Sequence, residues 1–386
     1  MTNDFIIYGS GLSSKLLALS LARNNFKSLI ISDKKDKNKE SNLVTFLSEG
    51  SLKYISETLE HDSIFNKCEN ITKLHCDHLN LKKETKLEFE DYNRSILGKI
   101  VPNVTIDKLL NDRILSSSDY IQISDHQEIT PEINDKRITI RDKSGDTTSA
   151  SLLFYCASRQ ENELLCNFDF VEKKLDQIAI SALVNIKRFR HNIAYQLFTK
   201  EGPVAILPIK GDEASVVWSL KENSSILKFS QNQLESHLNG LFENYVSDLK
   251  IKNMQTQKLN FSYAKKMHQD KVVLIGNIAH NIHPIAGQGF NLTIKDISKI
   301  VYYIKKYNSM GLELNSNQIL ESFSNNRKFD NFVFSFGTLA MENIFSSKNK
   351  IIRNLTSKGL GLVNGTRPLK KYFVEKATGK SNFKDC

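Results

Sequence analysis

The hydrophobic positions at the start of the chain predict a strand, a helix and a second strand in close succession. Residues Phe5–Tyr8 form an apolar run that ends at a Gly-Ser-Gly turn, and leucines then recur at helical spacing as far as Asn24. A second apolar run, from Phe26 to Ile31, ends at Asp33. These elements predict a βαβ unit of about 30 residues, followed by a charged, exposed loop over residues 34–41.

The middle of the chain alternates polar and apolar positions, as the strands of an antiparallel sheet do. Such alternation predicts strands over residues 70–90, 120–156, 178–218 and 259–263. Within the second of these segments, residues 143–146 predict a hairpin turn that joins strands at 138–140 and 152–155. Helical spacing predicts helices over 106–115 and 231–249, the second of them amphipathic.

The last third of the chain begins with a buried strand and continues as helices. The β-branched run Val272–Ile275 predicts the strand, and helical spacing begins at Phe290 and extends to about Lys306. Helical patterns return over 318–345 and in a basic segment over 368–377. The order of these elements implies that the chain leaves its first domain and re-enters it near residue 272.

The composition favours a globular protein of a reducing compartment. Of its residues 40% are hydrophobic, and no apolar run of about 18 residues could cross a membrane as a helix. The N-terminus lacks the basic region of a signal peptide and the five cysteines form no CxxC pair, so we expect free thiols and a cytoplasmic location. The net charge of +10 is typical of a Lys-rich composition, and it also suits a peripheral contact with the anionic inner face of a membrane. No basic helix interleaved with aromatic residues indicates nucleic-acid binding.

The first candidate site is the glycine turn after the first predicted strand. Gly9 and Gly11 fit the GxGxxG fingerprint of dinucleotide-binding folds, and Ser14 replaces the third glycine with a small residue. The turn opens a helix through Leu12 and Ser13, whose N-terminal N–H groups suit a pyrophosphate. Asp33 stands at the end of the second strand, where a carboxylate accepts hydrogen bonds from ribose hydroxyls.

A second glycine-rich loop lies far along the chain, between the strand that ends near Gly276 and the helix that begins near Phe290. It contains His283-Pro284 and then Gly287-Gln288-Gly289. Unpaired N–H groups at such a turn also suit an anionic group. Two loops of this kind, one near each end of the chain, predict a flavin nucleotide bound between them.

The second loop resembles the late flavin motif of the para-hydroxybenzoate-hydroxylase-like monooxygenases, and in particular that of the ubiquinone-biosynthesis hydroxylase branch. The matching residues are Gly276-Asn277-Ile278-Ala279-His280, then Pro284, then Gly287-Gln288-Gly289-Phe290-Asn291. The resemblance implies that Asn277 hydrogen-bonds the ribityl chain of FAD and that backbone from Gly287 to Asn291 faces the pyrimidine end of the ring. Pro284 is expected near the ring and, with His283, forms the candidate catalytic pair. Loop packing or capping is the alternative role for His280 and His283.

A third segment resembles the substrate-pocket strands of the same hydroxylases. It reads Gly202-Pro203-Val204-Ala205-Ile206-Leu207-Pro208, followed by Ser215-Val216-Val217-Trp218-Ser219, and Gln196 and Phe198 precede it. The resemblance implies a substrate-binding set of Gln196, Phe198, Ala205, Leu207, Pro208 and Trp218. Further similarity at 47–51, 326–331, 359–362 and 368–370 extends the resemblance over nearly the whole chain.

The resemblance and the pattern together predict an α/β (α+β) fold. We expect a Rossmann-like FAD-binding domain, interleaved with an antiparallel-sheet substrate domain and followed by a helical C-terminus. The FAD-binding domain is predicted over 1–75, 95–175 and 265–310, the substrate domain over 76–94 and 176–264, and the C-terminal helices over 311–386.

The resemblance implies an FAD-dependent monooxygenase that uses NADH or NADPH and O2 to hydroxylate the ring of a polyprenyl phenol in ubiquinone biosynthesis, through reduced flavin and a flavin hydroperoxide. Partners would be that substrate and a ubiquinone-biosynthesis complex. The family's Asp-Gly motif is absent, because Cys156-Ala157-Ser158 stand in its place. This absence motivates one alternative, a catalytically weak, FAD-binding scaffold subunit. Another flavoenzyme of the same fold, such as an isoprenoid reductase, is a second alternative that stays open.

A group of metal-ligand residue types at His75-Cys76-Asp77-His78 is not predicted to bind a metal. An alternating strand places His75 and Asp77 on one face and Cys76 and His78 on the other. No complementary Cys/His pair lies nearby in the sequence.

Overall fold

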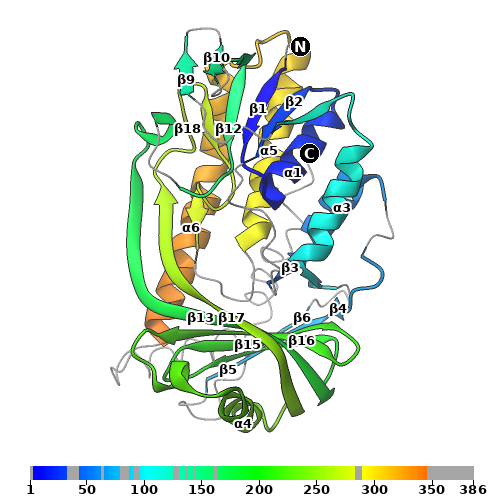
Figure 1. Ribbon diagram of the computed structural model, residues 1–386, viewed down its shortest axis with the longest axis vertical. Coiled ribbons are helices and arrows are strands. Elements are labelled where there is room, and N and C mark those ends of the chain that lie inside the picture. The colour runs from blue at the N-terminus through cyan, green and yellow to red at the C-terminus, as the bar shows by residue number, and fades with distance from the viewer. Residues whose placement is uncertain are drawn as a thin grey trace.

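The structure is a computed structural model that describes residues 3–32, 43–61, 65–78, 87–90, 96–124, 130–134, 137–141, 145–159, 163–282 and 289–345. Its elements gather around two main sheets, one of six strands and one of eight (Figure 1). The two long strands β13 (Phe170–Arg188) and β17 (Ser247–Ala264) run from the level of the first sheet down into the second (Figure 1). The predicted α/β class, with a second, mostly antiparallel sheet and a long C-terminal helix, is confirmed.

The six-stranded sheet has the order β18-β19-β12-β1-β2-β8, and all of its neighbours are parallel except the edge strand β18. Its members are β1 (Phe5–Tyr8), β2 (Ser28–Ile31), β8 (Ile121–Ser124), β12 (Leu152–Tyr155), β18 (His268–Gln269) and β19 (Val272–Leu274). Every residue of β1, β2, β12 and β19 is buried, as expected of parallel strands covered on both faces. The chain leaves this sheet after β12 and returns to it at β18, as the order of elements predicted.

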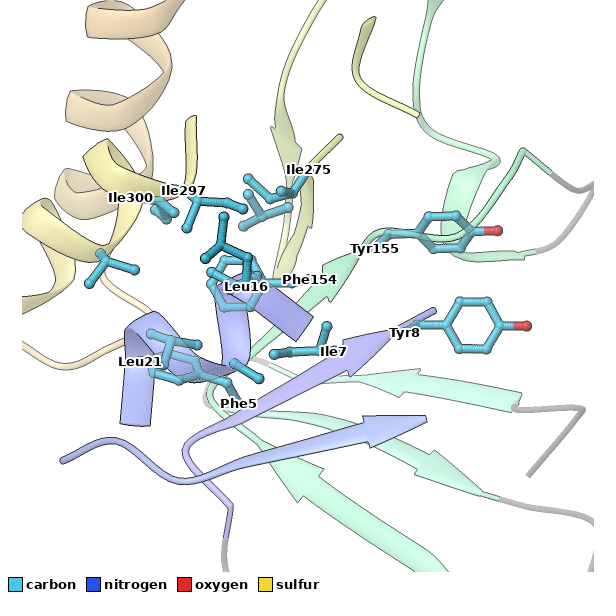
Figure 2. Packing of buried hydrophobic residues seen from close by; sticks show 14 of the residues in the cluster. Phe5, Ile7, Tyr8, Leu16, Leu21, Phe154, Tyr155, Ile275, Ile297 and Ile300 are labelled. Carbon is cyan, nitrogen blue, oxygen red and sulfur yellow. The ribbon is translucent and has the colours of Figure 1, made fainter. Parts of the chain in front are cut away.

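Helices α1 (Leu12–Ala22) and α5 (Gly289–Ser309) cover one face of this sheet. Figure 2 shows Leu16 of α1 and Ile297 of α5 packed around Phe154 and Ile275, all of them fully buried. On the other face the rings of Tyr8 and Tyr155 lie side by side with centroids 5.2 Å apart (Figure 2). The period-two alternation of each strand therefore separates a helix-covered face from a second buried face.

The eight-stranded sheet has the order β20-β17-β13-β16-β15-β14-β5-β6 and is antiparallel except for the parallel pair β14 and β5. Besides β13 and β17 it contains β5 (Lys73–His78), β6 (Leu87–Glu90), β14 (Ile193–Phe198), β15 (Pro203–Lys210), β16 (Glu213–Lys221) and β20 (His280–Asn281). Helix α4 (Gln231–Leu241) packs on its outer face. The inner face packs against a small sheet of β3 (Val44–Ser48), β7 (Gly98–Pro102) and β4 (Asn70–Ile71).

The remaining described elements surround these sheets. Helix α2 (Glu49–Leu59) follows β3, α3 (Asn103–Leu115) follows β7, and α6 (Asn317–Phe345) packs along α5. Within the described part of the chain, no helix is long and apolar enough to cross a membrane.

Two element predictions are wrong. The hairpin joins β10 (Ile138–Arg141) to β11 (Thr147–Ala150), beside β9 (Thr130–Ile133), whereas β12 pairs in parallel with β1. The physical reason is that every residue of β12 is apolar and buried, which suits a central parallel strand rather than an exposed hairpin arm. The helix predicted over 231–249 ends at Leu241, and β17 begins at Ser247, because Asn239 caps the turn by bonding both backbone groups of Leu249.

Candidate functional site

Three strand ends bring the two glycine loops to one edge of the six-stranded sheet. Strands β1, β12 and β19 are parallel neighbours, so their carboxyl ends lie together, and Gly9, Cys156 and Gly276 follow closely after them. The ladder continues past the strands, since Cys156 N donates to Tyr8 O at 2.8 Å and Ile275 N donates to Tyr155 O at 3.0 Å. Ligands of open α/β sheets bind at such carboxyl edges.

Glycine occupies the two positions of the first turn for different physical reasons. Gly9 has φ +124°, and a Cβ there would lie 2.8 Å from the backbone nitrogen of Ala157, so the fold itself requires glycine. Gly11 has an ordinary φ of −76°, is exposed, and would place a Cβ in open space. No described residue therefore fills the space in front of Gly11.

The N-terminus of α1 opens onto that space. Gly11 is the N-cap and provides no side-chain hydrogen bond, so the first-turn N–H groups of Leu12, Ser13 and Ser14 have no side-chain cap. These donors and the positive end of the helix suit a pyrophosphate. Ser14 itself is fully buried, which fits its role as a small residue for close packing. The chain thus fits the dinucleotide half of FAD at the predicted turn.

The second loop contacts the first directly. Gly276 has φ +89°, and a Cβ there would lie 2.8 Å from Oγ and 3.2 Å from Cβ of Ser13, with Thr293 of α5 at 3.8 Å. Asn277, next along the chain, is exposed. The predicted approach of the two loops is therefore present in the fold. Ala279, however, is 2% exposed in the core, and both its backbone N–H and its carbonyl are bonded within the protein, so its predicted cofactor contact is not supported.

The start of α5 is tied to the small sheet by the side chain of Asn291. Its Oδ1 accepts from the backbone N–H of Ser48 at 2.9 Å, and its Nδ2 donates to the carbonyl of Phe46 at 2.6 Å. Phe290 is half-buried against the core beside half-buried Gly289. The side chain of Asn291 thus has a structural role, and the predicted backbone contact with the cofactor stays a prediction.

Several predicted site residues lie outside the described part of the chain. They are the candidate catalytic pair His283 and Pro284 and the candidate cofactor contacts Asp33, Gly287 and Gln288. Their roles remain predictions.

A buried polar network holds the end of the second loop to α5 and α6. His280 Nε2 contacts Asp296 Oδ2 at 2.5 Å, and Asp296 Oδ1 accepts from Arg327 Nε at 2.7 Å and from Asn331 Nδ2 at 3.0 Å. All four side chains are at most 2% exposed. Burial tends to raise the pKa of Asp296, but the Arg327 guanidinium and His280 hold that pKa below its ordinary value. His280 therefore has the structural role that was the alternative to catalysis.

Asp296, the centre of this network, was not among the residues predicted from the sequence. A carboxylate inside an otherwise apolar helical stripe, with Ile294 and Ile297 on either side, was the available signal. The similarity at 326–331 marked the partners Arg327 and Asn331 without indicating what they bind.

The predicted substrate residues divide between the two faces of the eight-stranded sheet. Ala205 and Leu207 belong to the inner-face cluster with Phe46 of β3, and Gln196 pairs with Ala205 across the ladder on the same face. Phe198 shares this face, since it lies two residues beyond Gln196 on β14. Gln196 is 4% exposed, and its Oε1 has no hydrogen-bond partner among the described residues. This inner face therefore combines apolar side chains with one buried acceptor that has no partner among the described residues.

Trp218 and Pro208 lie on the outer face. Trp218 is 1% exposed in the cluster under α4 and stacks on His237 with ring centroids 5.6 Å apart. Pro208 pairs with Ala214, another member of that cluster. The predicted substrate contact of these two residues is therefore not supported, because alternation along β16 presents Val217, not Trp218, to the inner face.

The segment that replaces the Asp-Gly motif carries no ionised side chain. Burial raises the pKa of the Cys156 thiol to about 12, with the Ser14 hydroxyl opposing that shift, so the thiol is neutral at physiological pH. Ala157 is buried against Gly9. Neither side chain can supply the carboxylate that the family motif has here.

The residues at 75–77 form hydrogen bonds instead of a described metal site. Tyr245 OH donates to Asp77 Oδ2 at 2.8 Å and contacts His75 Nε2 at 3.2 Å, which confirms that His75 and Asp77 share a face. His75 Nδ1 contacts Glu88 at 3.3 Å. Among the described residues, no group of three or more His, Cys, Asp or Glu is placed to hold a metal.

Comparison with known proteins agrees with this geometry. Residues 158–328 match the family model described as an FAD binding domain. The chain is 26% identical over 206 residues to a ubiquinone hydroxylase UbiL of Rhodospirillum rubrum, which covers 53% of this chain and 48% of that protein. It is 23% identical to the mouse mitochondrial ubiquinone biosynthesis monooxygenase COQ6 over 96% of this chain and 90% of that one.

Solved structures share the fold at low sequence identity. A p-nitrophenol 4-monooxygenase from Pseudomonas putida superposes with a TM-score of 0.77 at 12% identity, over 98% of this chain and 99% of that one. Klebsiella pneumoniae HpxO, solved with FAD and uric acid, gives 0.74 at 12% identity, over 97% and 96%. With its two meeting glycine loops and its matching motifs, the chain is an FAD-dependent monooxygenase that is similar to the ubiquinone-biosynthesis hydroxylases.

Proposed function

We propose that this monooxygenase hydroxylates the aromatic ring of a polyprenyl phenol in ubiquinone biosynthesis, with NADH or NADPH as electron donor and O2 as co-substrate. The observation that carries the proposal is the junction of the two glycine loops, where Gly276 lies against Ser13 at the mouth of α1. The names of the relatives from Rhodospirillum and mouse support the substrate class.

The described residues at the two ends of the second loop support a site that joins cofactor to substrate. At one end of the loop, β20 pairs with β17 of the eight-stranded sheet. At the other end, Asn291 binds β3, whose Phe46 packs on the inner face of that sheet. A cofactor held by this loop would therefore lie near the apolar inner face that bears Ala205 and Leu207.

Each part of the chain has a distinct task in this proposal. FAD, when bound, supplies the redox chemistry. The first turn of α1 binds its pyrophosphate, Asp33 its ribose and Asn277 its ribityl chain. The inner face of the eight-stranded sheet orients the phenol ring and excludes water, and Gln196 Oε1 accepts a hydrogen bond from a ring hydroxyl. His283 and Pro284 remain the proposed neighbours of the reacting ring.

A second candidate, the catalytically weak scaffold subunit, has a specific observation in its favour. The neutral segment Cys156-Ala157-Ser158 lacks the carboxylate tied to pyridine-nucleotide handling in the family. Such a subunit would bind FAD but show no NAD(P)H oxidation stimulated by substrate. An isoprenoid reductase would instead add hydrogen, and not oxygen, to its substrate.

The test is the quinone-intermediate profile, by mass spectrometry, of ubiquinone hydroxylase-deficient bacteria that carry this gene. Restored ubiquinone in one mutant would support ring hydroxylation and identify the carbon. Failure in every such mutant, with folded FAD-bound protein present in the cells, would reject the hydroxylase and favour the scaffold. A matched strain that carries the Gly11→Ala variant, in which the added Cβ meets no described atom within 4 Å, controls for effects of expression alone.

A further inference from the structure

A groove of about 780 Å³ lies where α1, α2 and α5 meet. Its lining comes from α2 and from the C-terminal halves of α1 and α5, whereas the glycine loops precede the N-termini of α1 and α5. The groove is therefore separate from the proposed flavin site by the length of α1. Its volume falls within the range of cavities that bind small molecules.

The charges around the groove are predominantly positive. Arg23, Lys53, Lys305 and Lys306 line it, with Glu57 as the one acidic side chain among the lining residues. The carboxylate of Glu57 lies between two of these cations, with Oε2 4.0 Å from a guanidinium nitrogen of Arg23 and Oε1 3.8 Å from Nζ of Lys53. Both distances exceed that of an ordinary hydrogen bond. In the part of the chain that the structure describes, Lys305 and Lys306 form no ion pair.

The helix ends compensate only part of this charge. Arg23 is the C-cap of α1 and Lys306 stands in the last turn of α5, and each helix C-terminus carries a partial charge of about −0.5. Four cations against one carboxylate and two such ends leave about two net positive charges. An anion with one or two charges would complement this surplus.

A buried hydroxyl points to the same conclusion. Ser20 lines the groove, is 2% exposed, and its Oγ has no hydrogen-bond partner among the described residues. A buried polar group without a partner is unfavourable unless a ligand or water satisfies it. Phosphate oxygens accept hydrogen bonds both from such a hydroxyl and from lysine or arginine.

We propose that this groove binds a phosphate-bearing ligand, either a soluble phosphorylated molecule or the headgroup of an anionic phospholipid. The phosphate lies among Arg23, Lys305 and Lys306 and accepts a hydrogen bond from Ser20. Tyr302 also lines the groove. The Nζ atom of Lys306 lies over its ring, 6.0 Å from the centroid. This site does not depend on the proposed hydroxylation.

The experiment uses the full-length protein saturated with FAD, so that the flavin site is occupied. Inorganic pyrophosphate is titrated calorimetrically, and vesicles of phosphatidylcholine with or without phosphatidylglycerol are tested by co-flotation. The variant Lys305→Gln/Lys306→Gln removes two charges from the groove. The matched variant Lys173→Gln/Lys174→Gln removes two exposed charges from β13, and Ser20→Ala removes the buried hydroxyl.

The proposal predicts that the groove pair weakens binding at least tenfold, that Ser20→Ala weakens it several-fold, and that the β13 pair has little effect. Binding of pyrophosphate alone would identify a soluble ligand, and binding of phosphatidylglycerol vesicles alone would identify a lipid headgroup. Equal weakening by the two lysine pairs would show a response to net charge only and would overturn the proposal. So would the absence of binding to both probes by the unaltered protein.

Discussion

The contact between Gly276 and Ser13 makes a sharp prediction for the variant Gly276→Ala. The added Cβ would lie 2.8 Å from Oγ and 3.2 Å from Cβ of Ser13, and its backbone would have to keep φ +89°. The Ser13 hydroxyl can rotate away, but its Cβ is fixed by the backbone of α1. The variant must therefore either strain the second loop or move it away from the N-terminus of α1.

Two contributions set the magnitude. A positive φ in a non-glycine residue costs about 1–2 kcal/mol, and overpacking of a close contact typically costs about 1–3 kcal/mol. Together they lower the free energy of unfolding by about 2–5 kcal/mol, a large part of the total of about 5–15 kcal/mol that is typical of a folded protein. Separation of the two loops should also weaken FAD binding, because the loops meet where the cofactor is proposed to lie.

The matched control is Gly311→Ala. Gly311 has a similar φ of +83°, and a Cβ there meets no atom within 4 Å, so this variant carries the backbone strain without the crowding. The assay is urea unfolding of the FAD-free proteins, followed by titration of each with FAD. Gly276→Ala should lose about 1–3 kcal/mol more than Gly311→Ala and should bind FAD more weakly. Equal losses, with unchanged FAD affinity, would refute the reasoning about the junction.

Four further predictions concern the site and its support. Gly11→Ala should lower the FAD-free stability by no more than about 1 kcal/mol, because the added Cβ meets no described atom within 4 Å and alanine is a poorer N-cap than glycine. It should nevertheless raise the Kd for FAD at least tenfold, as titration would show; unchanged affinity would contradict a close pyrophosphate. Asp296→Asn should destabilise by about 3–5 kcal/mol near neutral pH. The pKa of Asp296 in the folded protein lies below its ordinary value of about 3.9. The stability advantage of the unaltered protein over Asp296→Asn should therefore persist down to about pH 3.9 and be lost as the pH falls through the folded-state pKa. Urea unfolding across acidic pH would check this. Gln196→Leu should keep or raise stability, because it removes a buried unpaired oxygen, while it raises KM for the phenol in steady-state assays. Trp218→Phe should lower stability with KM unchanged; a changed KM would restore Trp218 to the substrate pocket.

The sequence was most informative where one pattern had one physical explanation. The apolar run of β1, the two glycines after it and the leucines of α1 permit little besides a strand, a tight turn and a buried helix. The run at Val272–Leu274 likewise indicated a buried strand, and its return to the first sheet followed from the order of elements. These features position both glycine loops.

The sequence was less informative where neighbours in space decide the outcome. The apolar segment at Leu152–Tyr155 can be read as a hairpin arm or as a central parallel strand, and only its pairing with β1 and β19 decides between them. A motif also does not say which face of a strand meets the substrate. Trp218 and Ala279 belong to matching segments, yet one packs under α4 and the other in the core.

The network around Asp296 shows a further limit of sequence patterns. Its members come from β20, α5 and α6, and no spacing along the chain relates His280 to Arg327. A buried charge becomes interpretable only when its partners are seen. The same holds for Asn291, whose motif indicates a backbone contact with flavin although its side chain binds β3.

The most direct test of the central claim is the mass of the product formed by purified protein. The protein would be saturated with FAD and supplied with air, NADH or NADPH, and a short-chain prenyl phenol. The account predicts a product one oxygen atom heavier, formed together with consumption of the pyridine nucleotide. A product heavier only by hydrogen, or FAD-bound protein that consumes no pyridine nucleotide in response to any prenyl phenol, would contradict it.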